Sequence, residues 1–243
     1  MEVHTHTHPD SYRDRKKWTH YFWEFLMLFL AVFCGFLAEN QREHFVEDQR
    51  AKVFARSLHN DMKTDTAELN RIIAWATDKE NHIDSLIGML NDRNKQNDIS
   101  FSVHASTLVS ISNFFPSNGT YHQMKNSGSL RYFKQALIDS LYQYENIIAR
   151  VKLREDAEIL KLETKIIPFV QTIINFEFFY RILHNEPLPN RVYVNLKDQA
   201  AHDLLNNYSI EIKSLINRRI FLYHQLKSKA IEILQMLKSK YHL

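Results

Sequence analysis

The chain has 243 residues, of which only four are glycine and five are proline, while helix-favouring residues such as Leu, Ile, Lys and Glu are common. Sandwiches and barrels need frequent turn residues, so this composition argues against an all-β fold and predicts an all-α protein. The formal net charge of +3 is small for this length, and it gives no support to a nucleic-acid partner.

The first twenty residues are predicted to form a short basic tail. His4, His6 and His8 alternate in it. Such a run binds metal ions weakly at best, and it is more typical of a disordered tail or an expression remnant. Four basic residues follow: Arg13, Arg15, Lys16 and Lys17.

Residues 21–38 are predicted to cross a membrane, because Glu24 is their only charged residue. Ten strongly apolar side chains contribute roughly −3 to −6 kcal/mol to insertion, whereas a central acidic residue costs about 2.5–3.5 kcal/mol. Trp18, Tyr21 and Trp23 cluster at one end, as aromatic residues do at membrane interfaces. The only cysteine, Cys34, lies within this segment and has no intrachain partner for a disulfide.

Two other interpretations of this segment remain. The strictly apolar run, residues 25–38, is short for a span, and a run of this length also fits a buried core helix. A cleaved signal peptide needs small residues at alternate positions, whereas Phe36 lies two residues before Ala38. An uncleaved anchor is preferred, because the segment is apolar on all sides and basic residues precede it.

The distribution of basic residues predicts the orientation. Within ten residues of the segment, four Lys or Arg residues precede it and only Arg42 follows, although the counts are equal within twenty residues. The positive-inside rule then places the N-terminus in the cytoplasm and the remainder in the periplasm of a bacterium. The predicted organisation is a tail at 1–20, a membrane helix at 21–38 and a helical bundle domain at 39–243.

The first half of the predicted bundle domain begins with one long amphipathic helix, because no glycine or proline interrupts residues 39–87. Its apolar stripe has gaps at Thr66 and Glu80. The stripe consists of Phe54, Leu58, Met62, Leu69, Ile73, Ala76, Ile83, Ile87 and Leu90. We expect a loop at residues 91–100, a short apolar helix at 103–115 and a turn at 116–119.

Two further helices are predicted in the second half. One carries an apolar stripe from Leu130 to Val151 and extends to about Ile166, before Pro168 breaks or kinks it. Residues 184–195 form a connection, and the last helix covers about residues 208–240. Three long stripes predict an antiparallel helical bundle, continuous with the membrane helix.

The segment at residues 120–131 has the most informative local pattern. Gly128 can adopt the left-handed conformation that ends a helix, and Ser129 can cap the next one, so we expect a helix corner. The alternative is an anion site at a helix N-terminus, formed by Lys125, Ser127, Gly128 and Arg131.

No catalytic, cofactor-binding or metal-binding residue is assigned. The chain lacks glycine-rich phosphate loops, a nucleophile elbow and zinc motifs, and no histidine has a Glu three residues before it. His59 with Asp61, and His82 with Asp84, are too close in sequence to share a helix face.

Two stretches carry a resemblance to a family. The first is residues 24–43, EFLMLFLAVFCGFLAENQRE, followed by Ser57, Leu58, Asp61 and Asp65; the second is residues 121–131, YHQMKNSGSLR. Together they resemble an uncharacterised family of bacterial proteins with one N-terminal transmembrane helix followed by a helical domain. The resemblance covers about the first eighty residues and the middle corner, and little of the last seventy. It implies this topology and brings no catalytic residue.

These patterns predict a non-enzymatic, membrane-tethered module that binds a protein partner or ligand. Its other predicted partners are the lipid bilayer and a second copy of the chain, which it would contact through the membrane helix. In that helix Glu24 either reaches the interface beside His20 or contacts a polar group of a partner helix. The alternative is an enzyme or metal protein whose site is built from polar residues far apart in the sequence. Several buried Asp, Glu or His side chains that face one another in the core would favour this alternative.

Overall fold

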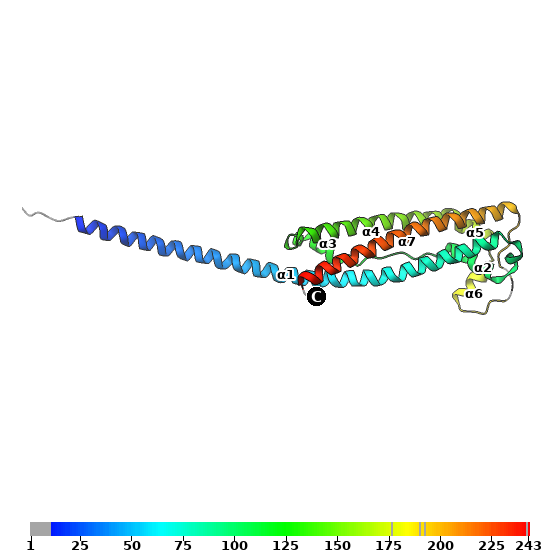
Figure 1. Ribbon diagram of the computed structural model, residues 1–243, viewed down its shortest axis with the longest axis horizontal. Helices are drawn as coiled ribbons and strands as arrows, with labels where there is room; N and C mark the ends of the chain where they lie inside the picture. Colours follow the sequence, from blue (N-terminus) through cyan, green and yellow to red (C-terminus); the bar gives the residue numbers. More distant parts are fainter. Residues whose placement is uncertain (1–10, 176, 190, 192, 242) are drawn as a thin grey trace, which may run out of the picture. The chain divides into compact units, whose positions relative to one another are not determined.

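A computed structural model gives the chain an all-α fold (Figure 1). It describes residues 11–175, 177–189, 191, 193–241 and 243, without the side chains of residues 11–17, 93 and 97. The histidines at 4, 6 and 8 and the basic side chains at 13–17 lie outside this description. The chain divides into two compact units, Met1–Val53 and Phe54–Leu243.

The first unit contains the candidate membrane span. Helix α1 covers Ser11–Leu90, and an 18-residue window in it reaches a mean hydropathy of 2.0. None of the side chains at residues 18–38 is buried, and Phe25 is 66% exposed. A core helix would bury such side chains. The structure therefore contains one helix, among the described residues, that is long and apolar enough to cross a membrane.

The second unit is built on three long helices, the later part of α1 with α4 (Gln135–Lys161) and α7 (Gln199–Tyr241). Buried positions in α1 alternate between spacings of three and four, which is the repeat of coiled coils. These positions are Ala55, Leu58, Met62, Asp65, Leu69, Ile72, Ala76, Lys79, Ile83, Leu86 and Leu90. The buried positions of α7 from Leu205 to Leu237 follow the same repeat, with Arg219 among them and Leu222 as one additional buried residue.

The apolar stripe predicted for α1 is confirmed in part. Phe54, Ile73 and Ile87 are only half-buried. At the two predicted gaps, the core positions are taken by charged residues, Asp65 beside Thr66 and Lys79 beside Glu80. The repeat is therefore unbroken in geometry, although two of its core positions are not apolar.

The three helices do not all alternate in direction. Asp65 contacts Tyr144, and fourteen residues further on in both helices Lys79 contacts Glu158, so α1 and α4 are parallel. Glu155 contacts Tyr223 and Ser140 contacts Glu232, so α7 runs antiparallel to α4 (Figure 1). The bundle is confirmed, but only α7 has the antiparallel direction.

An extended return segment makes the parallel pair possible. After the 3₁₀ turn η1 (Arg93–Asn97) come α2 (Ile99–Ser106) and the 3₁₀ turn η2 (Thr107–Val109). Residues 110–118, here called the strap, then run along the bundle without regular secondary structure (Figure 1). The predicted helix at 103–115 is therefore wrong beyond Val109, and the predicted turn at 116–119 leads directly into α3 (Gly119–Asn126).

The helix that contains Pro168 continues past it. A π-helical turn, η4 (Leu162–Ile166), joins α4 to α5 (Ile167–Ile173), which has Pro168 in its first turn. A first-turn position needs no N–H, so the proline is tolerated there, and the predicted distortion takes the form of the π turn. Next come α6 (Glu177–Leu183) and an isolated bridge between Ile174 and Val194.

Helix α7 begins earlier than the predicted position near residue 208. Its first residue is Gln199, and the Asp198 carboxylate accepts a hydrogen bond from the Ala201 N–H at 2.8 Å. This contact satisfies one of the free N–H groups at the helix start. The cap was visible in the sequence, whereas the apolar stripe used for the prediction begins later.

Candidate functional site

Four charged side chains meet in the core of the bundle, and they are the first candidate for a site. Lys79 lies on α1, Glu155 and Glu158 lie on α4, and Arg219 lies on α7, all nearly inaccessible to solvent. Burying a charge is costly unless it is paired and hydrogen-bonded. Two cations here face two carboxylates, so the cluster is neutral overall.

The pairing within this cluster is direct. The two Glu158 oxygens lie 3.4 Å from Lys79 Nζ and 2.7 Å from Arg219 Nη1. Arg219 also donates hydrogen bonds to the Tyr223 hydroxyl, which donates to Glu155 Oε1 at 2.5 Å. These five side chains connect all three long helices, and we call them the core clamp.

The core clamp binds the backbone of the strap. Lys79 donates to the Ser110 carbonyl at 2.6 Å, and Arg219 donates to the Ser112 carbonyl. Glu155 accepts the Phe114 N–H at 2.9 Å. An extended segment packed against helices has no ladder partner, so its buried backbone groups need hydrogen bonds from side chains. The buried charges supply these contacts.

Asp65 has the same role further along the strap. Its two oxygens accept the Ser117 N–H and the Tyr144 hydroxyl, each at 2.6 Å. Burial raises the pKa of Asp65, and the hydrogen bond from Tyr144 opposes this shift. Burial also lowers the pKa of Lys79 to about 8. The nearby Glu158 carboxylate partly opposes this shift, because it favours the charged ammonium.

This arrangement has the chemistry of a structural brace. The buried carboxylates of Asp65, Glu155 and Glu158 face helices across the core, as an enzyme or metal site requires, but each accepts hydrogen bonds from the chain itself. Within the described residues, no group of three or more His, Cys, Asp or Glu side chains could hold a metal ion. The core clamp is not predicted from the sequence. The pattern that could reveal it is the presence of charged residues at core positions of the three–four repeat.

Residues 120–131 have the geometry of a helix corner. Gly128 has a φ of +70°, and Ser129 begins η3, a 3₁₀ turn over Ser129–Tyr132. Ser129 is therefore not the cap of the next α-helix, because α4 begins at Gln135. Lys125 Nζ lies 3.3 Å from a Glu145 oxygen, which neutralises one of the cations of the suggested anion site. Ser127 Oγ is hydrogen-bonded to Ser129 Oγ at 2.7 Å.

Among the described residues, His59 is not paired with Asp61 and His82 is not paired with Asp84, as their spacing in the sequence predicts. His82 contacts His104, with 2.9 Å between the Nδ1 atoms, and Asp84 pairs with Lys213 instead. Asp61 accepts the Thr120 N–H at the start of α3 rather than contacting His59. His82 and His104 form a hydrogen-bonded pair that joins α1 to α2.

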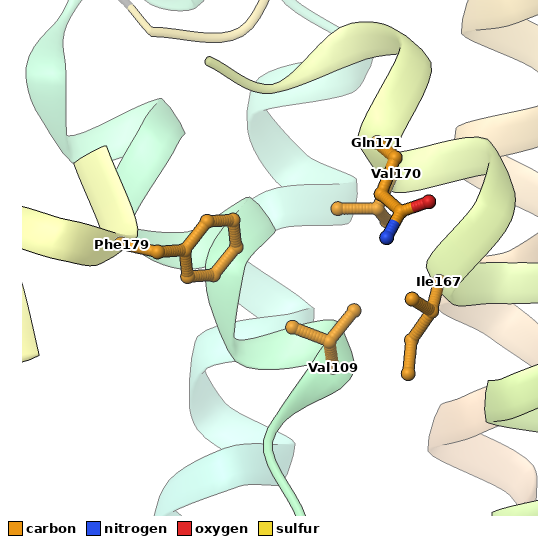
Figure 2. Close-up of a pocket in the computed structure, with 5 residues that line it drawn as sticks. All are labelled: Val109, Ile167, Val170, Gln171 and Phe179. Carbon is orange, nitrogen blue, oxygen red and sulfur yellow. The ribbon is translucent and has the colours of Figure 1, made fainter. Parts of the chain in front are cut away.

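A small apolar pocket of about 280 Å³ lies where η2, α5 and α6 meet. Figure 2 shows Phe179 of α6 facing Ile167, Val170 and Gln171 of α5, with Val109 between them. Engineered cavities of about 150 Å³ hold benzene, and ligand pockets begin at about 300 Å³. This pocket therefore has room for a ring or a short aliphatic group, with one carboxamide at its wall.

A second hollow, on the surface between α4 and α7, is different in character. It measures about 300 Å³ and is lined by Arg150, Leu153, Arg154, Arg218, Phe221 and Leu222. Phe221 is 59% exposed and Leu153 is 65% exposed. Among the described residues, the three arginines have no ion pair or side-chain hydrogen bond. We call this hollow the arginine groove.

The chain matches no protein-family model, and neither the curated proteins nor the solved structures include a significant match. The resemblance to a bacterial family therefore stays a prediction. The function has to be argued from the candidate span, the core clamp and the two hollows.

Proposed function

We propose that this protein is a membrane-tethered, non-enzymatic helical module that binds a protein partner or ligand. The observation that supports it most is the division of the charged groups in the bundle. The buried ones are engaged in holding the strap, whereas Arg150 and Arg218 of the groove are exposed, Arg154 is half-buried, and none of the three has an ion pair among the described residues. Groups of the second kind remain available to another molecule.

The tether is supported by the first unit. None of the side chains of residues 18–38 is buried, and the segment is apolar enough for insertion. We propose an uncleaved anchor in a bacterial inner membrane, with the N-terminus cytoplasmic and the bundle periplasmic, because basic residues dominate before the segment. Contact between two copies through the membrane helix, involving Glu24, is part of this proposal.

The alternative, an enzyme or metal protein, has less support. Its best candidate groups are the buried carboxylates, and their oxygens already accept hydrogen bonds from Arg219, the strap backbone and tyrosine hydroxyls. A catalytic acid or base needs access to a substrate proton.

Fractionation of cells tests the tether. The full-length chain should stay with membranes after high-salt and carbonate washing, and a variant without residues 21–38 should be released. A full-length chain that is washed off would overturn the proposal. Alkaline phosphatase fused after Leu243 tests the orientation, since it is active only in the periplasm; a stable but inactive fusion would reverse it.

A further inference from the structure

We propose that the arginine groove binds an acidic, partly apolar segment of a partner protein. This inference rests on the proposed function and deepens it, because it names the surface and the chemistry of the partner. The groove was not visible as a motif in the sequence, since its residues come from two helices about seventy positions apart.

The described residues that line the groove include three arginines and no carboxylate. Arg150 and Arg154 are one helical turn apart on α4, where like charges repel each other, and Arg218 of α7 lines the same hollow. Exposed carboxylates on these helices are engaged elsewhere, Asp156 with Lys152 and Glu211 with Lys161. An external carboxylate would relieve this repulsion.

The side chains present match the chemistry of a carboxylate-bearing protein segment. The planar guanidinium group of arginine binds carboxylates through two parallel hydrogen bonds, which makes the pairing specific in direction. Three such groups along one hollow suit several carboxylates on one segment. Arginine and aromatic residues are also enriched at protein interfaces and at their energetic centres.

The apolar residues of the groove indicate more than a counterion site. Leu153 and Phe221 expose most of their side chains, and the buried Leu222 lines the hollow with them. An apolar side chain of the partner placed between them would remove this surface from water. A concave hollow with separate apolar and cationic groups fits an amphipathic segment better than a flat layer of lipid headgroups.

Binding of synthetic peptides to the full-length chain in phosphatidylcholine nanodiscs tests the inference. The probe is a labelled amphipathic peptide of Glu and Leu, and its counterpart has Gln in place of every Glu. The chain should bind the Glu peptide and not the Gln peptide. Each of R150Q, R154Q and R218Q should weaken binding by about tenfold, the loss of one charge-assisted contact. F221S should weaken it as well.

Matched controls separate the groove from general charge. Arg56 is an exposed arginine of α1 without an ion pair among the described residues, and Leu160 is 62% exposed on α4. R56Q and L160S should bind the Glu peptide as the unaltered chain does. Empty nanodiscs show any binding of the peptide to lipid alone.

Three results would overturn the inference. Equal affinity for the two peptides, or equal affinity of all variants, would leave the groove as a solvated basic face. Flotation with phosphatidylserine vesicles that is lost in R150Q, R154Q and R218Q, without peptide binding, would make the groove a lipid-binding surface. None of these results depends on the carbonate wash, so failure of the groove and failure of the tether are distinguishable.

Discussion

Arg218 and Arg219 are adjacent in the sequence, yet they belong to two regions of the bundle that differ in how their positive charges are paired. Arg219 is buried in the core clamp, where Glu158, Tyr223 and the Ser112 carbonyl surround its guanidinium group. Arg218 lines the groove with Arg150 and Arg154, and no carboxylate is among the lining residues in the described part of the chain. In the core clamp, positive and negative side chains are equal in number and pair with one another. At the groove, the positive side chains are accessible to another molecule.

The difference shows how to separate structural from binding charges in a helical bundle. A buried cation has to be paired, because an unpaired charge in the core costs several kcal/mol. An exposed cation can stay unpaired at little cost, and a cluster of such cations slightly destabilises the fold. Residues of the first kind should therefore affect stability, and residues of the second kind should affect binding.

Replacing each of the two arginines gives the largest expected contrast. R219A removes the nearer of the two cationic partners of Glu158, leaving only Lys79 at 3.4 Å, and should lower the free energy of unfolding by up to about 3–5 kcal/mol. R218A should change it by less than about 0.5 kcal/mol. Urea unfolding of the full-length chain in detergent, followed by circular dichroism, measures both. Equal effects of the two variants would contradict the division into two regions.

The pH dependence of stability sharpens the account of the clamp. Burial lowers the pKa of Lys79 from 10.5 to about 8, so the folded state releases its proton before the unfolded state does. The free energy of unfolding should therefore rise between about pH 8 and 10.5, by up to about 3 kcal/mol. K79M should lose this rise. Parallel pH profiles for K79M and the unaltered chain would show that Lys79 does not cause it.

A smaller effect is expected from the hydroxyl group that joins Arg219 to Glu155. Y223F removes one hydroxyl and the hydrogen bonds that it makes with the buried Arg219 and Glu155, which should cost about 1–3 kcal/mol. Y142F is a matched control, because Tyr142 is exposed on α4. Thermal unfolding of both variants measures the difference, and an unchanged midpoint for Y223F would remove Tyr223 from the clamp.

The smallest effect is expected at the groove itself. R154Q removes one of two repelling charges on α4 and should be neutral or should stabilise the chain by about 0.2–0.5 kcal/mol at low salt. Added salt should abolish the gain, because exposed charges are screened. A loss of more than about 1 kcal/mol in urea unfolding would mean that Arg154 has a partner within the chain.

The membrane segment and the long helices follow from local patterns in the sequence. An apolar run reveals a candidate span without any knowledge of the fold, and a spacing of three and four reveals a buried helix face. Gly128 is a further example, because its left-handed conformation depends on its own backbone. The stripes at α1, α4 and α7 were predicted in this way, but the charged core positions Asp65 and Lys79 of α1 and the first residues of α4 and α7 were not.

The strap, the direction of α4 and the arginine groove depend on residues distant in sequence. Residues 110–115 have a helix-compatible apolar pattern, but their backbone groups are bound by Lys79, Arg219 and Glu155, which lie on three different helices. The helix propensity of a residue does not depend on such distant partners, so it cannot predict them. The sequence by itself determined the helices and the candidate span, because these depend on neighbouring residues. Only the tertiary structure decided which charges pair in the core and which meet at the surface, because each pairing joins residues from separate helices.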